Sequence, residues 1–191
     1  GSEMCIRDRN RRETTKMLCE LLERQYFSGM GKYWAKEVSI DPWAEKGKPK
    51  RVDYMQFIPA NQCSVSEIEK GIFVCYEIKS CKEDFYSGNG LNFLGEKNYI
   101  VTTMQCYKEL LEDMRNGKFW KHIHENFPES ATHVGVMVAV PEYTTAADEF
   151  ESPTPINTDK KWKLAVVMPC HYGLRKKSMI ELLFCMLRSG H

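Results

Sequence analysis

Three ionisable side chains on two predicted strands could together form a catalytic site. Asp53 lies near the start of an apolar strand predicted over residues 51–58, where a carboxylate requires a partner. Glu77 and Lys79 lie at the end of the next apolar strand, which begins at residue 71. Strand alternation places both on one face, roughly 7 Å apart. If the two strands form a hairpin, two carboxylates and one ammonium group meet around one point.

These residue types are suited to metal-assisted hydrolysis of a phosphate ester. Carboxylate oxygens are hard ligands that bind Mg²⁺ or Mn²⁺, and the bound ion generates hydroxide and stabilises charge on a phosphate. An ammonium group such as that of Lys79 stabilises the attacking water or the developing negative charge. The Glu-x-Lys spacing is common in charged chains, so the alternative interpretation is an exposed ion pair with little energetic effect.

Apolar periodicity predicts the elements that position these three residues. A helix is predicted over residues 12–26, followed by strands over 33–40, 51–58 and 71–78. Ser64 and Glu67 have the spacing of a capping box ahead of the third strand. The remaining predicted elements are a short helix at 82–85, a strand at 99–103, a helix at 104–114, a strand at 134–140, an exposed loop at 141–161, a strand at 163–168 and a helix at 179–186. This order predicts an α/β fold with a mixed β-sheet flanked by helices.

Composition restricts the class of protein. The chain has 191 residues and 42% hydrophobic content, which is typical of a globular domain and excludes disordered and collagen-like classes. We predict a tag remnant and flexible N-terminus over residues 1–10 and a single domain over residues 11–191. No apolar run approaches the roughly 20 residues that span a bilayer, so we expect a cytoplasmic protein with no membrane partner. The eight cysteines include no Cys-x-x-Cys pair, which favours free thiols.

Charge is balanced in total but uneven along the chain. The 27 basic and 26 acidic side chains give a formal net charge of +1, which by itself does not indicate a nucleic-acid-binding protein. Basic residues nevertheless concentrate at positions 7–12, 46–51 and 175–177. The fold could therefore assemble a locally positive face from separate segments.

A longer motif surrounds Glu77 and Lys79. The sequence E-I-K-S at residues 77–80 is followed by D-F at residues 84–85, and further stretches of the same pattern occupy residues 36–38, 50–53, 88–95, 98–101 and 181–189. In these stretches the chain resembles the PD-(D/E)XK nuclease superfamily, and most closely its MmcB-like branch of DNA-repair and phage-associated nuclease-like proteins. The resemblance is concentrated in residues 36–103, and it implies a restriction-endonuclease-like core.

The resemblance also implies a function and roles for individual residues. It implies a metal-dependent DNA endonuclease, with DNA as the partner, in DNA repair or phage DNA processing. Asp53, Glu77 and the Ile78 carbonyl would bind Mg²⁺ or Mn²⁺, and Lys79 would assist catalysis. Each assignment follows from the matching position in the motif.

Superfamily members also carry an acidic residue upstream of Asp53, and three residues are candidates for it. The MmcB-like pattern favours Glu37, on the strand before Asp53. Glu13 and Glu20, both on the first predicted helix, are the alternatives, and many superfamily members carry this acid near the position of Glu13. Asp84 either binds the metal, supports the ligands from behind or caps the following helix.

One departure from the superfamily pattern leaves other functions open. Leu91, Asn92 and Phe93 occupy the position where better-known members carry a basic Lys-Trp segment. This departure favours a second hypothesis, a non-cleaving nucleic-acid-binding or assembly module on the same fold. A small-molecule hydrolase with the same carboxylates is a third hypothesis. Because many nucleases that cut both strands act as dimers, a homodimer is also among the expected assemblies.

Other side chains are weaker candidates for chemistry. His122 and His124 could bind a metal, but on a helix the two rings point about 200° apart. Cys170 and His171 could form a nucleophile and base, although adjacent residues rarely face each other. Lys97, just before the fourth strand, could approach the proposed site. Several aromatic side chains could stack on bases, but core packing is the simpler interpretation for this group: Tyr33, Trp34, Trp43, Phe85 and Tyr86.

Overall fold

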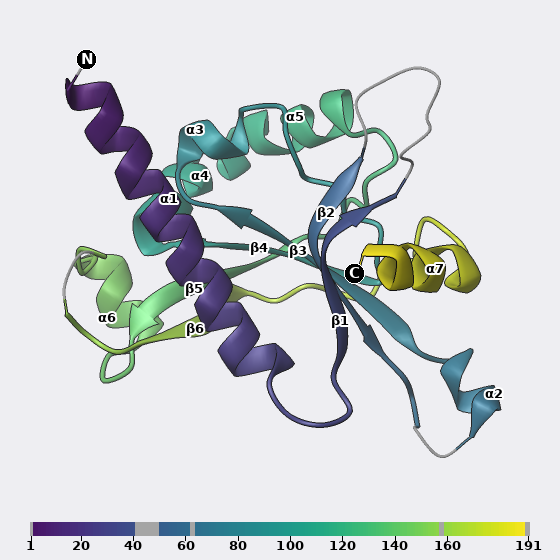
Figure 1. The fold of residues 1–191 in the computed structure, drawn as a ribbon. Helices are drawn as coiled ribbons and strands as arrows, with labels where there is room; N and C mark the ends of the chain where they lie inside the picture. Colours follow the sequence, from purple (N-terminus) through teal and green to yellow (C-terminus); the bar gives the residue numbers. More distant parts are fainter. Residues whose placement is uncertain (1, 41–49, 62–63, 157–158, 190–191) are drawn as a thin grey trace.

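A computed structural model describes residues 2–40, 50–61, 64–156 and 159–189 of the chain, with side chains from Asn10 onward. Trp43, Lys46, Lys48 and Cys63 lie outside the described residues. The elements, in chain order, are α1 Ser2–Leu22, the π-helical turn η1 Glu23–Phe27, β1 Tyr33–Ser39, β2 Arg51–Ile58, α2 Val65–Ile68, β3 Ile72–Lys79, α3 Lys82–Phe85, β4 Lys97–Thr103, α4 Met104–Arg115, α5 Lys118–Asn126, β5 Gly135–Pro141, α6 Ala146–Glu151, β6 Trp162–Met168 and α7 Met179–Ser189 (Figure 1).

The strands form one mixed sheet whose order follows the sequence from β1 to β6. Strands β1, β2 and β3 form an antiparallel meander. Strands β3, β4 and β5 are parallel, and β6 returns antiparallel to β5. The predicted α/β class with a mixed sheet flanked by helices is confirmed.

One face of the sheet packs against α1 and η1, which cross it diagonally (Figure 1). Leu18, Leu21 and Leu22, on one side of α1, share a buried cluster with Tyr76 of β3 and Val101 of β4. The apolar spacing that predicted the first helix therefore forms the contact with the sheet.

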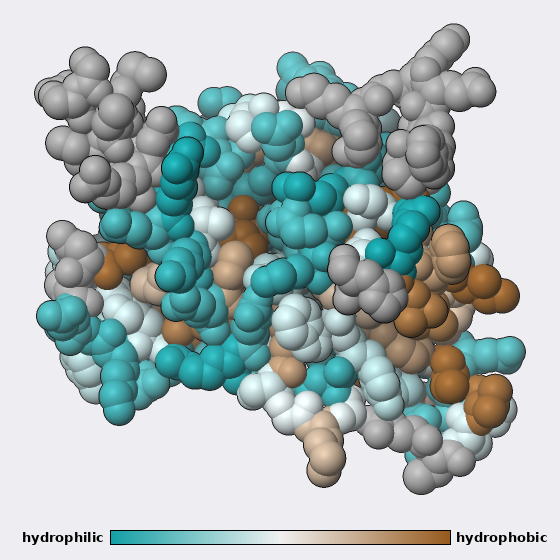
Figure 2. Space-filling view, viewed as in Figure 1, coloured by the Kyte–Doolittle hydropathy of each residue, from teal (hydrophilic) through white to brown (hydrophobic). Residues whose placement is uncertain are grey.

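The opposite face is covered by α4 and α5 over β4 and β5, and by α7 over the meander. Leu182 and Cys185 of α7 are buried with Phe73 of β3. The outer side of α7 instead exposes Ile180, Phe184 and Leu187. Figure 2 shows hydrophobic surface on the side of the molecule where α7 lies, whereas the surface over α1 is mostly hydrophilic.

The β2–β3 hairpin pairs from Ile58 and Ile72 as far as Tyr54 and Tyr76. One residue beyond this last pair, the register brings Asp53 level with Glu77. Alternation along β3 keeps Glu77 and Lys79 on the face that carries the buried Phe73 cluster, as predicted. The two strands thus bring their acidic residues to the same end of the sheet.

Three local predictions are corrected. The first helix begins at Ser2 rather than residue 12 and continues as η1 to Phe27. The predicted loop at 141–161 contains α6, because Thr145 and Asp148 form a capping box that starts a helix there. The box predicted at Ser64 does not form, since this residue makes no side-chain cap to α2.

No helix in the described part of the chain is both long and apolar enough to cross a membrane. The cysteines with described side chains are free thiols, in agreement with the prediction from their spacing: Cys19, Cys75, Cys81, Cys106, Cys170 and Cys185.

Candidate functional site

A cleft of about 1650 Å³ opens where β2 and β3 carry their acidic residues. Its walls come from α1, from the start of β2, and from the segments at residues 88–94 and 126–130. Asp53, Ile78 and Lys79 line it. Tertiary folding therefore joins the predicted hairpin site to segments far away in the sequence.

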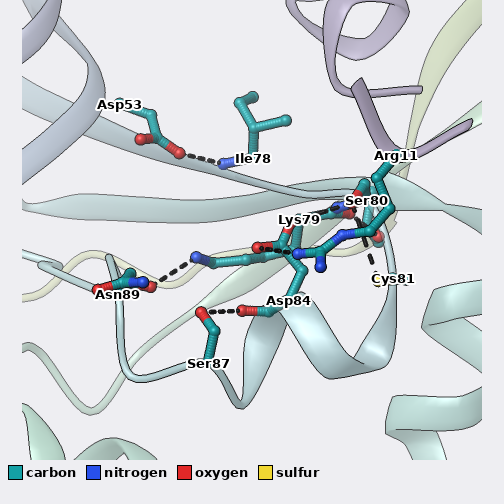
Figure 3. A network of polar contacts seen from close by, with 10 residues as sticks. Arg11, Asp53, Ile78, Lys79, Ser80, Cys81, Asp84, Ser87 and Asn89 are labelled. Carbon is teal, nitrogen blue, oxygen red and sulfur yellow. Dashed lines mark hydrogen bonds and ion pairs between the residues drawn. The ribbon is translucent and has the colours of Figure 1, made fainter. Parts of the chain in front are cut away.

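Asp53 occupies the point where β2 and β3 stop pairing. Its Oδ2 accepts a hydrogen bond of 2.8 Å from the main-chain nitrogen of Ile78 (Figure 3). The carboxylate thus takes a donor that a neighbouring strand would otherwise satisfy. This bond holds Asp53 against the strand that carries Glu77.

Glu77 is fully buried and only partly satisfied. Its side chain is 0% exposed, and Oε1 accepts a bond of 3.1 Å from the main-chain nitrogen of Asn92. Oε2 is buried without a hydrogen-bond partner among the described residues. Burial, followed by the negative charge of Asp53, raises the pKa of Glu77 well above its ordinary value, against the opposing effect of Lys79. A buried carboxylate oxygen without a hydrogen-bond partner is costly, so this atom is a candidate ligand for a cation.

Lys79 is held in the same recess. Its side chain is 3% exposed, and Nζ donates a bond of 2.8 Å to the carbonyl of Asn89 (Figure 3). Gly90, with φ +75°, packs directly over both catalytic candidates, because a Cβ on it would lie 2.7 Å from Glu77 Oε2 and 2.8 Å from Lys79 Nζ. Glycine is required at this position both for its backbone conformation and for this close approach.

Asp84 supports the turn that follows β3. Its Oδ2 accepts bonds of 3.0 Å and 3.1 Å from the main-chain nitrogen and hydroxyl of Ser80. Its Oδ1 lies 3.3 Å from a guanidinium nitrogen of Arg11 on α1 (Figure 3). Of the predicted alternatives, these contacts favour support behind the site, and they also tie α1 to the end of β3.

The donor set fits a small divalent cation. Asp53 and Glu77 supply carboxylate oxygens, one of them buried and unpartnered, and the Ile78 carbonyl belongs to the residue between Glu77 and Lys79. Within the described ranges, no group of three or more histidine, cysteine, aspartate or glutamate side chains could hold a metal. Mg²⁺ commonly binds through one or two carboxylates and retains several waters, so two carboxylates are sufficient.

The candidates for the upstream acid differ in their surroundings. Glu37 lines the cleft, where its carboxylate forms an exposed ion pair of 2.6 Å with Arg51. Its backbone is left-handed, with φ +55°, so alternation along β1 is interrupted there. Glu20 also lines the cleft and lies 3.8 Å from Lys16, whereas Glu13 is exposed outside it.

Glu23 is an acidic cleft residue that sequence reasoning missed. Its Oε1 accepts a bond of 2.6 Å from the Tyr54 hydroxyl and lies 3.6 Å from Nζ of Lys36. A polar stripe at helical spacing, through Arg12, Lys16 and Glu23, was the available signal. The π-helical turn, which begins at Glu23, could not be read from that spacing.

The cleft contains both charge signs in pairs. Among the residues that the structure describes, five ion pairs join a basic and an acidic side chain that both line the cleft: Arg11–Asp84, Lys16–Glu20, Lys36–Glu23, Lys50–Glu129 and Arg51–Glu37. A phosphate group would therefore compete with carboxylates for these cations. The cleft thus contains basic and acidic side chains in close pairs, as the near-neutral net charge of the whole chain would suggest.

The structure places the other candidate residues outside the proposed chemistry. Lys97 lies at the opposite end of β4, with Nζ 4.3 Å from the ring centroid of Tyr172. His122 packs among aromatic rings on α5 and contacts Asn126. The sulfur of Cys170 is bonded to the main chain, with Asn98 as donor.

The aromatic side chains follow the simpler interpretation in most cases. Trp34 stacks on Phe27 at 4.9 Å between ring centroids, and Phe85 is fully buried. Tyr86 donates a hydrogen bond to Asp113. Tyr33 is exposed. Core packing therefore accounts for the described members of this group except Tyr33.

Comparisons of this chain with models of known families, with curated proteins and with solved structures find no match. The arrangement of Asp53, Glu77 and Lys79 at the cleft is therefore the observation from which a function is inferred.

Proposed function

We propose that the protein is a Mg²⁺- or Mn²⁺-dependent deoxyribonuclease that hydrolyses phosphodiester bonds. The observation that carries this proposal is the buried Glu77 carboxylate with an unpartnered oxygen, beside Asp53 and Lys79. The large majority of buried side-chain polar atoms in proteins have a hydrogen-bond partner, so this unpartnered oxygen calls for an explanation, and a bound cation supplies one. The resemblance of residues 77–85 to the PD-(D/E)XK motif supports the same function.

Each residue has a distinct part in this proposal. Asp53, Glu77 and the Ile78 carbonyl would hold the cation, and Asp53 is already oriented by the Ile78 nitrogen. When bound, the cation supplies Lewis acidity that lowers the pKa of water and neutralises phosphate charge. Lys79 would exchange the Asn89 carbonyl for a phosphate oxygen, at which it stabilises developing negative charge.

DNA fits the cleft through its phosphates. The cations that line the cleft come from α1, β1, the start of β2 with the residue before it, and, at Lys79, from β3, so they could contact successive phosphates of one strand. Because five of these cations are paired with carboxylates, binding requires exchange of partners and should be weak, and it should weaken further as the salt concentration rises because the contacts are to phosphates. The proposed roles in DNA repair or phage DNA processing rest on the sequence resemblance alone.

Titration of Mn²⁺ into the wild-type protein by calorimetry, followed by incubation with labelled single-stranded, duplex and branched DNA, tests the proposal. Glu77→Gln should remove both Mn²⁺ binding and cleavage. Glu149→Gln is the matched control, because Glu149 is also buried but both oxygens accept bonds from Thr154. A wild-type protein that binds no Mn²⁺ and cleaves none of these DNAs would contradict the proposal.

The alternative is a non-cleaving nucleic-acid-binding or assembly module. It is supported by the paired charges of the cleft and by Leu91 and Phe93, which are buried where a basic segment was expected from the superfamily pattern. In that case, DNA binding would persist after removal of metal and in Glu77→Gln. Binding that weakens with salt but is insensitive to both changes would favour this alternative.

A further inference from the structure

The segment that covers the site has an unusual backbone. Gly88, Gly90 and Leu91 all have positive φ values, of 77°, 75° and 68°. Leu91 is a buried residue without the conformational freedom of glycine, so the surrounding structure must maintain this strained conformation. Strain of this kind concentrates at sites where the backbone has been positioned for function.

Asn92, the next residue, connects the two strands of the site. Its main-chain nitrogen donates to Glu77 Oε1 at 3.1 Å, and its Nδ2 donates to the carbonyl of Arg51 at 2.8 Å. Arg51 is the first residue of β2, two positions before Asp53. One buried residue thus holds Glu77 on one side and the start of the Asp53 strand on the other.

Asn92 connects β2 and β3 beyond the point where the two strands stop pairing through main-chain hydrogen bonds. Ladder pairing between β2 and β3 ends at Tyr54 and Tyr76, and beyond it the Ile78 nitrogen bonds to the Asp53 side chain. Without a ladder, the separation of the two carboxylates depends on other contacts. Asn92 supplies a contact that reaches both strands.

Ser130 fixes the same segment from behind. Its hydroxyl donates to the Leu91 carbonyl at 2.5 Å and accepts a bond of 3.1 Å from the Phe93 nitrogen. These two bonds flank Asn92 on both sides. Ser130 touches neither Glu77 nor Arg51 in these bonds, so its effect on the carboxylates passes through the backbone of residues 91–93.

We propose that Asn92 is a positioning residue that sets the separation between Asp53 and Glu77, and with it the affinity for the divalent cation. Asn92 does not bind the cation in this proposal. It acts through the Arg51 carbonyl and the Glu77 carboxylate, and Ser130 supports it. The inference rests on the proposed metal site.

The experiment compares Asn92→Ala with Asn98→Ala in the full chain. Asn98 is also buried, and its side chain bonds to the nitrogen and carbonyl of Gly95 at 3.1 Å and 3.0 Å, away from both carboxylates. Both variants should have lower thermal unfolding midpoints. Only Asn92→Ala should weaken Mn²⁺ binding in calorimetry, by about tenfold or more, the range found for residues that orient metal ligands.

Kinetics provide a second readout. With labelled DNA, Asn92→Ala should have a reduced kcat at limiting Mn²⁺ that recovers as Mn²⁺ is raised, with an unchanged KM for DNA. A loss of folded protein alone would reduce kcat at all Mn²⁺ concentrations. Ser130→Ala should show the same pattern with a smaller shift, and it carries the test if Asn92→Ala does not fold.

The outcomes separate this inference from the proposed function. If the wild-type protein binds no Mn²⁺, the metal site and the positioning role both fail. If the wild-type protein binds Mn²⁺ and Asn92→Ala, or Ser130→Ala in its place, binds with wild-type affinity, only the positioning role is overturned. An equal loss in Asn98→Ala would also overturn it, because the effect would then be one of general stability.

Discussion

Glu77 and Asp113 are both buried carboxylates, but their environments differ. Asp113, on α4, is 5% exposed and accepts bonds of 2.8 Å from Lys82 and 2.7 Å from the Tyr86 hydroxyl. Glu77 accepts a bond from the Asn92 nitrogen, with a weaker contribution from the Leu91 nitrogen, and its Oε2 has no hydrogen-bond partner among the described residues. The first carboxylate joins α4 to the segment around α3, whereas the second lies recessed beside the cleft.

The pKa values of these two groups shift in opposite directions. Burial acts to raise the pKa of Asp113, but the hydrogen bonds from Lys82 and Tyr86 outweigh it and lower the pKa below its ordinary value. At Glu77, burial and the charge of Asp53 prevail and raise the pKa. Burial alone therefore does not identify a functional site. A buried acid that its neighbours leave partly unsatisfied is the informative one.

The largest expected effect is a loss of DNA cleavage on substitution of Asp53, beside Glu77, but not on substitution of Asp113. Asp53→Asn should reduce Mn²⁺-dependent DNA cleavage by about a hundredfold or more, because it removes a ligand rather than a residue behind one. Asp113→Asn should leave the cleavage rate per folded molecule within about twofold. Comparable losses in both variants would remove the distinction between the two carboxylates.

Substitutions at the two carboxylates should change the free energy of unfolding in opposite directions. Asp113→Asn should lower the free energy of unfolding at pH 7 by about 1–3 kcal/mol, because Lys82 loses its anionic partner. Glu77→Gln should raise it in metal-free protein at pH 8, since an uncharged amide replaces a carboxylate that is costly to ionise when buried. Urea unfolding with EDTA measures both changes.

The pH dependence follows from the two pKa shifts. The folded-state pKa of Glu77 exceeds its unfolded value, so its contribution to stability is present below the unfolded pKa and is lost as pH rises through the folded pKa. The advantage of Glu77→Gln should therefore grow from pH 5 to pH 8. For Asp113 the folded-state pKa is depressed, and the penalty of Asp113→Asn should shrink as pH falls through that value. Changes in the free energy of unfolding that stay constant across this pH range in both variants would contradict both assignments.

Gly88 and Gly90, in the segment that covers Glu77 and Lys79, provide a further test at the site. Gly88 and Gly90 have almost the same positive φ, so Ala at either position should cost about 1 kcal/mol in backbone strain. A Cβ on Gly88 meets nothing within 4 Å, whereas one on Gly90 meets Glu77 and Lys79. Only Gly90→Ala should also weaken Mn²⁺ binding in calorimetry. Equal affinities in the two variants would place the segment outside the site.

The smallest expected change in stability concerns the predicted upstream acid. The Glu37–Arg51 pair is exposed on both sides, so Glu37→Gln should change the free energy of unfolding by less than about 1 kcal/mol. Any loss of cleavage would then report on chemistry alone, and we expect a loss if Glu37 assists the reaction as the resemblance implies. Unchanged cleavage would contradict that role. The next candidate for the upstream acid would then be Glu23, which is half-buried and bonded to the Tyr54 hydroxyl.

Local patterns in the sequence were sufficient for all six strands that the structure describes, for most of the helices and for the central motif. Alternation along residues 72–79 correctly placed Glu77 and Lys79 on one face, and the leucine spacing in α1 identified the stripe that packs on the sheet. Both patterns are periodic over a few residues, and burial of one face enforces them. Helix α6 was missed because the Thr145–Asp148 capping box, rather than an apolar stripe, starts it.

The hydrogen-bond partners of the motif residues come from segments that only the tertiary structure brings to them. The donor to Glu77 comes from Asn92, the support for that segment comes from Ser130, and the acid Glu23 reaches the cleft from a π-helical turn. Glu37 adopts a left-handed backbone that alternation could not predict. The physical reason is that the hydrogen bonding and desolvation of a side chain depend on whichever segments pack against it. Residue types and their local spacing therefore identify the side chains that could perform chemistry, whereas long-range packing leaves Glu77 as the carboxylate with an unpartnered oxygen among the described residues.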